Sequence, residues 1–477
     1  MKTLFRTKPI SDLLKTVGSK DKGLKRTLTA WDLVSFGIGC MIGVGIFVLP
    51  GQEAAVHAGP AIILSFGLAA IACACAALCY AELASMIPVA GSAYTYGYAT
   101  LGEIFAWIIG WDLILEYMVG ASLVSIGWSE YFVNFFNKSL EPFGYAFPKM
   151  LSASPFAHEN PGLINLPAIF IVFLLTVLLI RGIKESSNVN RLVVIIKILV
   201  IIIFIAIASW HINPTNWTPF MPFGFKGVMT AAAIVFIAFV GFDAVSTAAE
   251  EAKDPQKDVP IGIIGSLLIA TILYMAVSAI MTGVVPYTQF KDVAKPIALV
   301  LNTINKPFAS ILTSVGAIAG MTSVILVLLM AQPRILFAMS RDGLLPPVMS
   351  KVHPKFKTPY LTTILTGLIV AVAAGFTPIG VVAELCSIGT LAAFAIVSGG
   401  VLVLRIRKPD IPRPFKIPYY FFIAGLGLLS CLALMISLPL VTWIRFIVWL
   451  LIGFLVYFIY GKKSAQKVLE NGRNGAT

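Results

Sequence analysis

Residues 37–47 read GIGCMIGVGIF, with glycines at positions 37, 39, 43 and 45, inside a long apolar run near the start of the chain. A second apolar run contains residues 239–247, FVGFDAVST, which place a glycine two positions before an aspartate. Glycine lowers the cost of leaving helical dihedral angles, and unwound backbone at membrane depth persists only where it lines a cavity or is buried by protein. Such glycines can instead be positions of close helix packing. Two broken helices, however, predict a binding site at membrane depth.

The composition of the chain excludes most soluble classes. Of its 477 residues, 58% are hydrophobic and 12% are charged, and the mean hydropathy is +0.92. Soluble domains carry about 25% charged residues, about twice the share found here. Disordered chains combine low hydrophobicity with high charge, which is the opposite of this composition. Four His and six Cys are too few and too scattered for a disulfide framework or a metal site, and we expect no cofactor.

Apolar runs of about 20 residues are long enough to cross a bilayer. Twelve such runs lie near residues 31–57, 60–86, 103–133, 165–181, 189–210, 227–250, 260–284, 307–337, 359–376, 379–404, 418–437 and 440–460. The sequence therefore predicts an all-α integral membrane protein with twelve transmembrane helices.

The distribution of Lys and Arg predicts the orientation. With twelve spans both termini share a side, and 27 basic residues fall on that side against seven on the other. Cytoplasmic loops collect Lys and Arg, so we expect both termini in the cytoplasm. This bias explains the net charge of +13 without a nucleic-acid partner.

The two interruptions fall in spans one and six. If the chain repeats after five spans, the halves enter the membrane in opposite orientations and these two spans correspond, as in inverted-repeat transporters. The expected segments are a basic N-terminal segment (1–28), a first repeat (29–210), a second repeat (211–406), spans eleven and twelve (407–461) and a cytoplasmic tail (462–477).

Broken helices supply complementary charges for a zwitterion. Amides at a half-helix N-terminus bind a carboxylate, and carbonyls at a half-helix C-terminus accept from an ammonium. The first break, at Gly43–Gly45, is the expected carboxylate cradle, and Ile237–Val240 is the expected amine acceptor. An α-amino acid carries both groups.

Lys197, Asp112, Glu116 and Asp243 are the ionisable candidates inside the predicted spans. Lys197 is about 9 Å along its helix from Arg191, a depth at which a lysine can exchange protons or reach back to the surface. Asp112 and Glu116 share one helix face by their i, i+4 spacing, and Asp243 sits at the second break. Intramembrane ionisable residues are functional candidates, although the sequence does not show which groups meet.

Several ordered motifs resemble the cationic amino acid transporter family of the amino acid, polyamine and organocation superfamily. They are WDLVS (31–35) leading into 37–47, AGPA (58–61), LCYAE (78–82), GSAYTY (91–96), GWDLILEY (110–117), VGFD (240–243), EE (250–251), DPQ (254–256) and RDGLL (341–345). The likeness runs from about residue 25 to the end of span twelve.

The resemblance implies a leucine-transporter-like fold with two five-helix inverted repeats, broken helices one and six, and two peripheral helices. It implies an amino acid held between spans one, three, six, eight and ten. Lys197 matches a lysine that stands at the ion position of sodium-coupled members, whose hydroxyl pair is matched by Thr322 and Ser323. Members with cationic substrates carry a small residue at the position of Leu328, so a leucine there indicates a shorter pocket and favours small or neutral amino acids.

These arguments predict a secondary active L-amino acid transporter of the plasma membrane, with proton-coupled uptake by alternating access, and not an enzyme. Cationic amino acid transport and exchange without proton coupling stay open, as does the oligomeric state. The expected partners are the L-amino acid, protons and membrane lipids. The expected substrate-binding residues are Met41, Ile42, Gly43, Val44, Gly45, Glu116, Phe236, Ile237, Ala238, Val240 and Leu328. The expected proton-coupling residues are Lys197, Glu116, Asp243, Thr322 and Ser323.

Overall fold

A computed structural model describes residues 6–10, 13, 26–140, 144–156, 161–291, 293, 295–377, 379–436, 438 and 440–466. Within these residues the structure is helical, and its extended pairings are two isolated bridges, Leu28 with Ala252 and Ser152 with Asn165. The predicted all-α class is confirmed. The helices are α2 (Ala30–Met41), α3 (Val44–Phe47), α4 (Leu49–Glu53), α5 (Ile62–Met86), α6 (Ala93–Thr100), α7 (Glu103–Leu140), α8 (Leu166–Arg181), α9 (Ile183–Ala208), α10 (Gly224–Val235), α11 (Ala244–Thr247), α12 (Pro255–Val284), α13 (Pro296–Thr303), α14 (Pro307–Arg341), α15 (Tyr360–Phe376), α16 (Ile379–Arg407), α17 (Tyr420–Ile436) and α18 (Leu440–Val456).

Local signals in the sequence explain where helices begin. The main-chain N–H of Thr29 donates to the Asp32 carboxylate at 2.9 Å, and the Asp32 N–H faces the Thr29 hydroxyl, which forms a capping box before α2. Pro255, Pro296 and Pro307 each occupy the first position of a helix. Proline suits that position because its missing N–H would have no partner within the helix.

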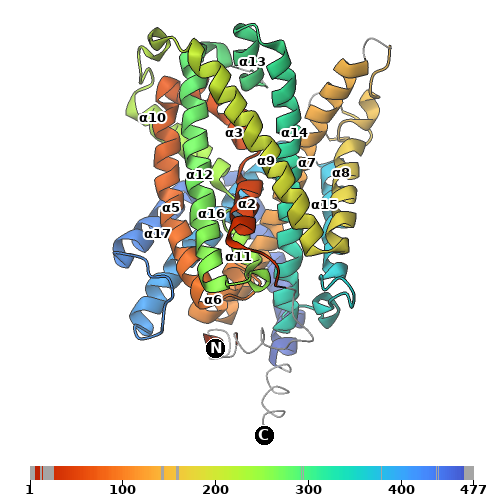
Figure 1. Ribbon diagram of the computed structural model, residues 1–477. Helices are drawn as coiled ribbons and strands as arrows, with labels where there is room; N and C mark the ends of the chain where they lie inside the picture. Colours follow the sequence, from red (N-terminus) through yellow and green to blue (C-terminus); the bar gives the residue numbers. More distant parts are fainter. Residues whose placement is uncertain are drawn as a thin grey trace.

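The long helices form one bundle around α2 and α11 (Figure 1). Helix α12 packs along α5 and α2, α14 along α7 and α9, and α16 along α7 and α17. We call the end that carries α6 and the start of α7 the lower end, and the end that carries α13 the upper end, as drawn in Figure 1.

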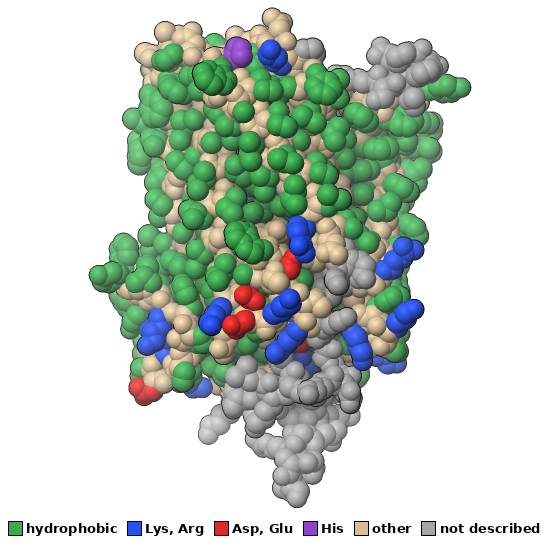
Figure 2. Space-filling model, in the orientation of Figure 1, with side chains coloured by type: hydrophobic (Ala, Val, Ile, Leu, Met, Phe, Trp, Pro, Cys, Tyr) green, Lys and Arg blue, Asp and Glu red, His purple; other side chains and the backbone are tan. Residues whose placement is uncertain are grey.

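The outer surface is suited to lipid. Eight helical stretches in the described part of the chain are long and apolar enough to cross a membrane, and four shorter apolar helices accompany them. Large apolar side chains such as Phe173, Leu192, Leu368 and Leu451 point outward from four different helices. Figure 2 shows apolar side chains over the middle of one face and charged side chains gathered toward the lower end. The chain is therefore a multi-pass membrane protein.

The structure refines the expected element boundaries. The predicted first span, 31–57, is not one helix, because α2 stops at Met41 and the chain continues as α3, α4 and a π-helical turn. The short helices α6 and α13 lie outside the predicted spans. Most of the predicted basic segment 1–28 and most of the tail 462–477 lie outside the described residues.

Candidate functional site

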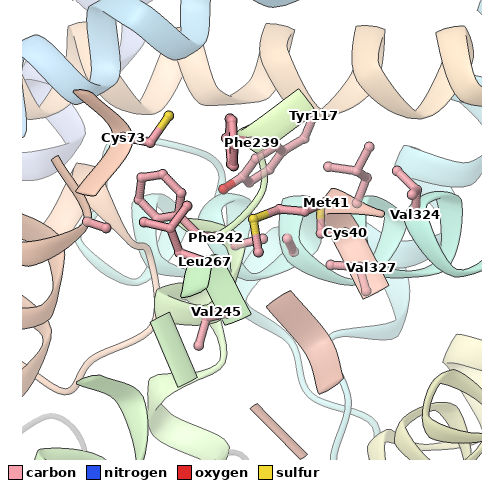
Figure 3. Packing of buried hydrophobic residues seen from close by; sticks show 14 of the residues in the cluster. Cys40, Met41, Cys73, Tyr117, Phe239, Phe242, Val245, Leu267, Val324 and Val327 are labelled. Carbon is pink, nitrogen blue, oxygen red and sulfur yellow. The ribbon is translucent and has the colours of Figure 1, made fainter. Parts of the chain in front are cut away.

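The two interruptions lie against each other. In the first, α2 ends at Met41 and Ile42 is extended before α3 begins. In the second, a 3₁₀ turn over Phe236–Phe239 prolongs α10, and Val240 is extended before α11. Cys40 and Met41 lie beside Phe239 and Phe242 in Figure 3.

Two glycines make the contact between the breaks possible. Gly241 has φ +119°, and an added Cβ there would lie 2.4 Å from the sulfur of Cys40. An added Cβ on Gly45 would lie 2.7 Å from the Cβ of Ala238. Neither position leaves room for a side chain, and Gly241 also needs a conformation that other residues rarely adopt. The close contact of the two breaks therefore depends on these two glycines.

Tyr274 of α12 joins the two breaks. Its hydroxyl lies 2.8 Å from the carbonyl oxygen of Met41 and 2.7 Å from that of Ala238. A hydroxyl has one proton, so it donates to one of these carbonyls at a time. The ring is buried between Phe66 and Phe239, with centroids 5.4 and 5.1 Å away. The packing fixes the ring, and the hydroxyl holds the ends of two half-helices together.

Lys197 of α9 is completely buried and points into the first break. Its Nζ lies 3.0 Å from the carbonyl oxygens of Ile38 and Gly39 and 2.9 Å from that of Ile42. It also donates to the Ser323 hydroxyl of α14 at 2.7 Å. These contacts tie three helices together through one ammonium group.

The second hydroxyl of the pair expected from the resemblance, Thr322, turns elsewhere. It donates to the carbonyl oxygen of Ile318 at 2.8 Å and accepts from the indole of Trp128 at 2.9 Å. Adjacent residues on a helix face different directions, so Ser323 and Thr322 cannot both face Lys197 in this arrangement. The structure brings Ser323, but not Thr322, to the ammonium.

Three carboxyl groups are buried in this region: Asp243 at the second break, and Glu116 and Asp112 one turn apart on α7. Glu116 accepts from the Thr390 hydroxyl at 2.6 Å, and Asp243 pairs with the Tyr117 hydroxyl. In the described part of the chain, one oxygen of Glu116 and both oxygens of Asp112 have no hydrogen-bond partner. Such oxygens can take a proton or a donor from a ligand.

A cavity of about 660 Å³ opens between the breaks and extends along α7. Eight of the residues expected to bind substrate line it: Met41, Gly43, Gly45, Glu116, Ile237, Ala238, Val240 and Leu328. Ile42 is buried outside the lining and presents its carbonyl to Lys197, while Phe236 packs on Phe394. The side chain of Val44 lies outside the described residues.

The deep part of the cavity is apolar. Val324, Leu328 and Cys386 form its wall beside Gly120. An added Cβ on Gly120 would lie 3.3 Å from a methyl carbon of Leu328 and 3.5 Å from the Cys386 sulfur. Leu328, where the sequence predicts a shorter pocket, is part of this wall.

The lower end is closed by ion pairs between buried or half-buried groups. They are Arg334 with Glu251 at 2.8 Å, Arg341 with Glu250 at 2.8 Å, Lys8 with Asp342 at 2.6 Å and Arg6 with Glu103 at 3.0 Å. Burial raises the pKa of the Glu251 carboxyl, and the Arg334 guanidinium opposes that shift. None of these residues lines the cavity, which reaches instead to Asn134 near the upper end of α7.

Several residues of the site were not predicted. Tyr274, Thr390 and Tyr117 act through hydroxyl groups whose partners lie on other helices. A polar group inside an otherwise apolar span is the available signal for Tyr274 and Thr390. Tyr117 directly follows Glu116, and Gly120 lies one turn further along the same helix.

Comparison with known proteins shows that the chain is similar to permeases. Residues 28–458 match the family model described as amino acid permease. The chain is 53% identical to a branched-chain amino acid permease of Bacillus subtilis, over 97% of this chain and 99% of that protein. It is 48% identical to a methylthioribose transporter of the same organism, over 98% and 99% of the two chains. It is 37% identical to a vacuolar cationic amino acid transporter of Arabidopsis thaliana, over 86% and 68%.

Proposed function

Since the chain belongs to the amino acid permease family, a family of transporters and not of enzymes, we propose that it imports neutral, branched-chain L-amino acids with protons. The observation that carries this proposal is the meeting of two broken helices at an apolar cavity. Backbone charges at the breaks suit the zwitterionic part of any amino acid, and the apolar wall suits a hydrocarbon side chain.

The proposed architecture has twelve spans in two inverted repeats of five, with spans eleven and twelve at the periphery. Eight long and four shorter apolar helices support this count. The boundaries proposed for the repeats are 29–210 and 211–406. With both termini in the cytoplasm of a bacterial cell, the lower end faces inward and the cavity faces outward; the bias of Lys and Arg supports this orientation.

In the proposed complex, the substrate carboxylate lies at the N–H groups that follow Gly43. The ammonium lies at the carbonyl ends near Ile237–Val240. Of these carbonyls, that of Ile237 accepts from the Val240 N–H at 3.2 Å and that of Ala238 faces Tyr274. A carbonyl oxygen has two lone pairs, so each can still accept from an ammonium.

The proposed side-chain site lies between Gly120, Leu328 and Cys386. The branched-chain permease of Bacillus subtilis, 53% identical, supports this substrate class. A guanidinium or ammonium side chain placed at this site would meet the apolar wall of Leu328 and Cys386 in place of an acid. Arginine and lysine are therefore the less favoured substrates.

Lys197 is the proposed coupling residue. While charged, it shares its three N–H donors among the three carbonyls at the end of α2 and the Ser323 hydroxyl. Loss of its proton removes the charge and one donor, so the hold on α2 weakens. Glu116, which lines the cavity and has an oxygen without a hydrogen-bond partner in the described chain, and Asp243 at the second break are the proposed proton acceptors.

Uptake by the purified protein in liposomes tests the proposal. We expect labelled leucine, isoleucine and valine to accumulate when the outside is acidic, and little accumulation of arginine, lysine or methylthioribose. Lys197→Ala should lose gradient-driven accumulation. Counterflow without gradient-driven uptake would show an exchanger, and accumulation of methylthioribose or arginine in place of leucine would overturn the substrate class.

A further inference from the structure

The cavity is much longer than one amino acid. Its lining on α7 runs from Glu116 through Gly120, Val124 and Gly127 to Asn134, which is about 27 Å along the helix axis at 1.5 Å per residue. An extended leucine is about 7 Å long by standard bond lengths. A leucine held at the helix breaks leaves the upper part of the cavity open.

The upper part has its own charged groups. Lys295 and Glu130 both line it, whereas Glu116 is the ionisable group on the floor. The Lys295 ammonium lies 2.7 Å from the Asn134 side-chain oxygen and 4.9 Å from the centre of the Tyr131 ring. Glu130 and Asn134 are one turn apart on α7, so they face the same side of that helix. A positive and a negative group thus border one space.

The first turn of α13 adds partial positive charge next to Lys295. Lys295 is the residue that precedes this helix, and the N-terminal end of a helix carries a partial positive charge. A recess of about 10 Å³, close to the volume of one water molecule, lies beside Tyr131, Lys295, Ile297 and Ala298. Helix α13 stands at the upper end of the bundle in Figure 1, and Lys295, which precedes it, lines the cavity.

We propose that the upper part of the cavity, between Lys295 and Glu130, is a second and weaker binding site for a zwitterionic amino acid. The carboxylate binds at Lys295 and the first turn of α13, and the ammonium binds at Glu130. The aliphatic side chain lies over Tyr131 and toward Leu123. This inference rests on the proposed function, because the same substrate then passes from the outer site to the inner one.

The charges of the outer site are more exposed than those at the breaks. Glu130 is exposed, whereas Glu116 is buried. Salt screens exposed charges over about 10 Å at 0.1 M ionic strength and screens buried groups less. Raised ionic strength should therefore weaken the outer site before it weakens the inner one.

Equilibrium binding of labelled leucine to the full-length protein in lipid nanodiscs tests the proposal. We expect about two leucines per chain at saturation, with the weaker component lost as ionic strength rises. Lys295→Gln and Glu130→Gln should each leave one. Lys291→Gln is the matched control, because it removes the same charge from an exposed position outside the cavity lining and should leave two.

A second variant separates the two sites. Gly120→Leu fills the space beside Leu328 and Cys386, so it should abolish the inner site and leave one salt-sensitive leucine. One leucine per wild-type chain, or two in Lys295→Gln, would overturn the outer site while leucine uptake in liposomes still stands. A wild-type chain that takes up no neutral amino acid would instead overturn the proposed function.

Discussion

The ammonium of Lys197 donates to the hydroxyl of Ser323 across 126 positions of sequence, at a distance of 2.7 Å. The one proton of that hydroxyl is shared between the carbonyl oxygen of Gly39, at 2.9 Å, and that of Gly320 on its own helix, at 2.8 Å. Through these contacts α9, α14 and the end of α2 share one buried junction. A change in the charge of Lys197 is therefore felt directly by the helix that ends at the cavity.

Ser323→Ala should reduce proton-driven leucine uptake about tenfold, because it removes one ligand of the ammonium. Thr322→Ala is the matched control and should change uptake less than twofold, since Thr322 contacts Trp128. Initial rates in liposomes with an inward proton gradient measure both. Equal losses in the two variants would contradict the junction.

Tyr274→Phe should raise the leucine KM several-fold and lower the stability of the protein by about 1–2 kcal/mol, because the one donor that the two buried carbonyls share is then lost. Uptake kinetics and thermal unfolding measure the two effects.

A control for this change is Tyr80→Phe. The Tyr80 ring is buried, and its hydroxyl has no hydrogen-bond partner in the described chain, so its loss should leave KM unchanged. A Tyr274→Phe protein with wild-type KM would show that the hydroxyl does not hold the breaks.

Gly241→Ala should destabilise the protein by about 2–4 kcal/mol, because the new methyl group meets the Cys40 sulfur and the residue keeps a positive φ. Gly425→Ala adds the same methyl group where nothing lies within 4 Å and should be neutral. Thermal unfolding in detergent compares them, and similar melting temperatures would argue against the close contact of the breaks.

Leu328→Ala should shift the substrate preference toward longer side chains such as methionine and phenylalanine, because it deepens the apolar pocket. Gly120→Ala should act in the opposite sense and disfavour leucine relative to alanine, since its methyl group approaches Leu328 at 3.3 Å. Competition by unlabelled amino acids against labelled leucine measures both. The same ranking in both variants would place the side-chain site elsewhere.

Lys8→Gln should loosen the lower end, because it breaks the 2.6 Å ion pair with the half-buried Asp342. Hydrogen–deuterium exchange should then rise about tenfold in α6 and in the loop after α14. The exposed Lys253 offers a control, and Lys253→Gln should leave exchange unchanged. Unaltered exchange in Lys8→Gln would show that this pair does not keep the lower end closed.

The sequence predicted the parts of the site that depend on local backbone chemistry. Glycine spacing located both breaks, and the depth of Lys197 in an apolar run marked it as functional. Both signals are local, since a glycine-rich stretch or a buried charge is costly wherever it occurs. The helical class followed from another local signal, the length of the apolar runs.

Contacts between distant helices could not be predicted. The rotation of α14 decides that Ser323 faces Lys197 while Thr322 faces Trp128, and one residue of sequence cannot fix that rotation. The pairing of Glu116 with Thr390 joins positions 274 apart. Helices α6 and α13 were missed because each is too short to give an apolar run of about 20 residues, the signal from which the spans were predicted.

The acceptors of Lys197 on α2 are main-chain carbonyls, which every amino acid supplies, whereas the wall of the cavity is made of side chains. Mutation can therefore alter the shape of the wall without removing those acceptors. A chain of this kind can change the shape of its cavity through a few substitutions at positions such as Gly120 and Leu328 while the contacts of Lys197 stay intact. The wall of the cavity and the contacts of Lys197 can therefore be changed independently, by evolution or by protein engineering.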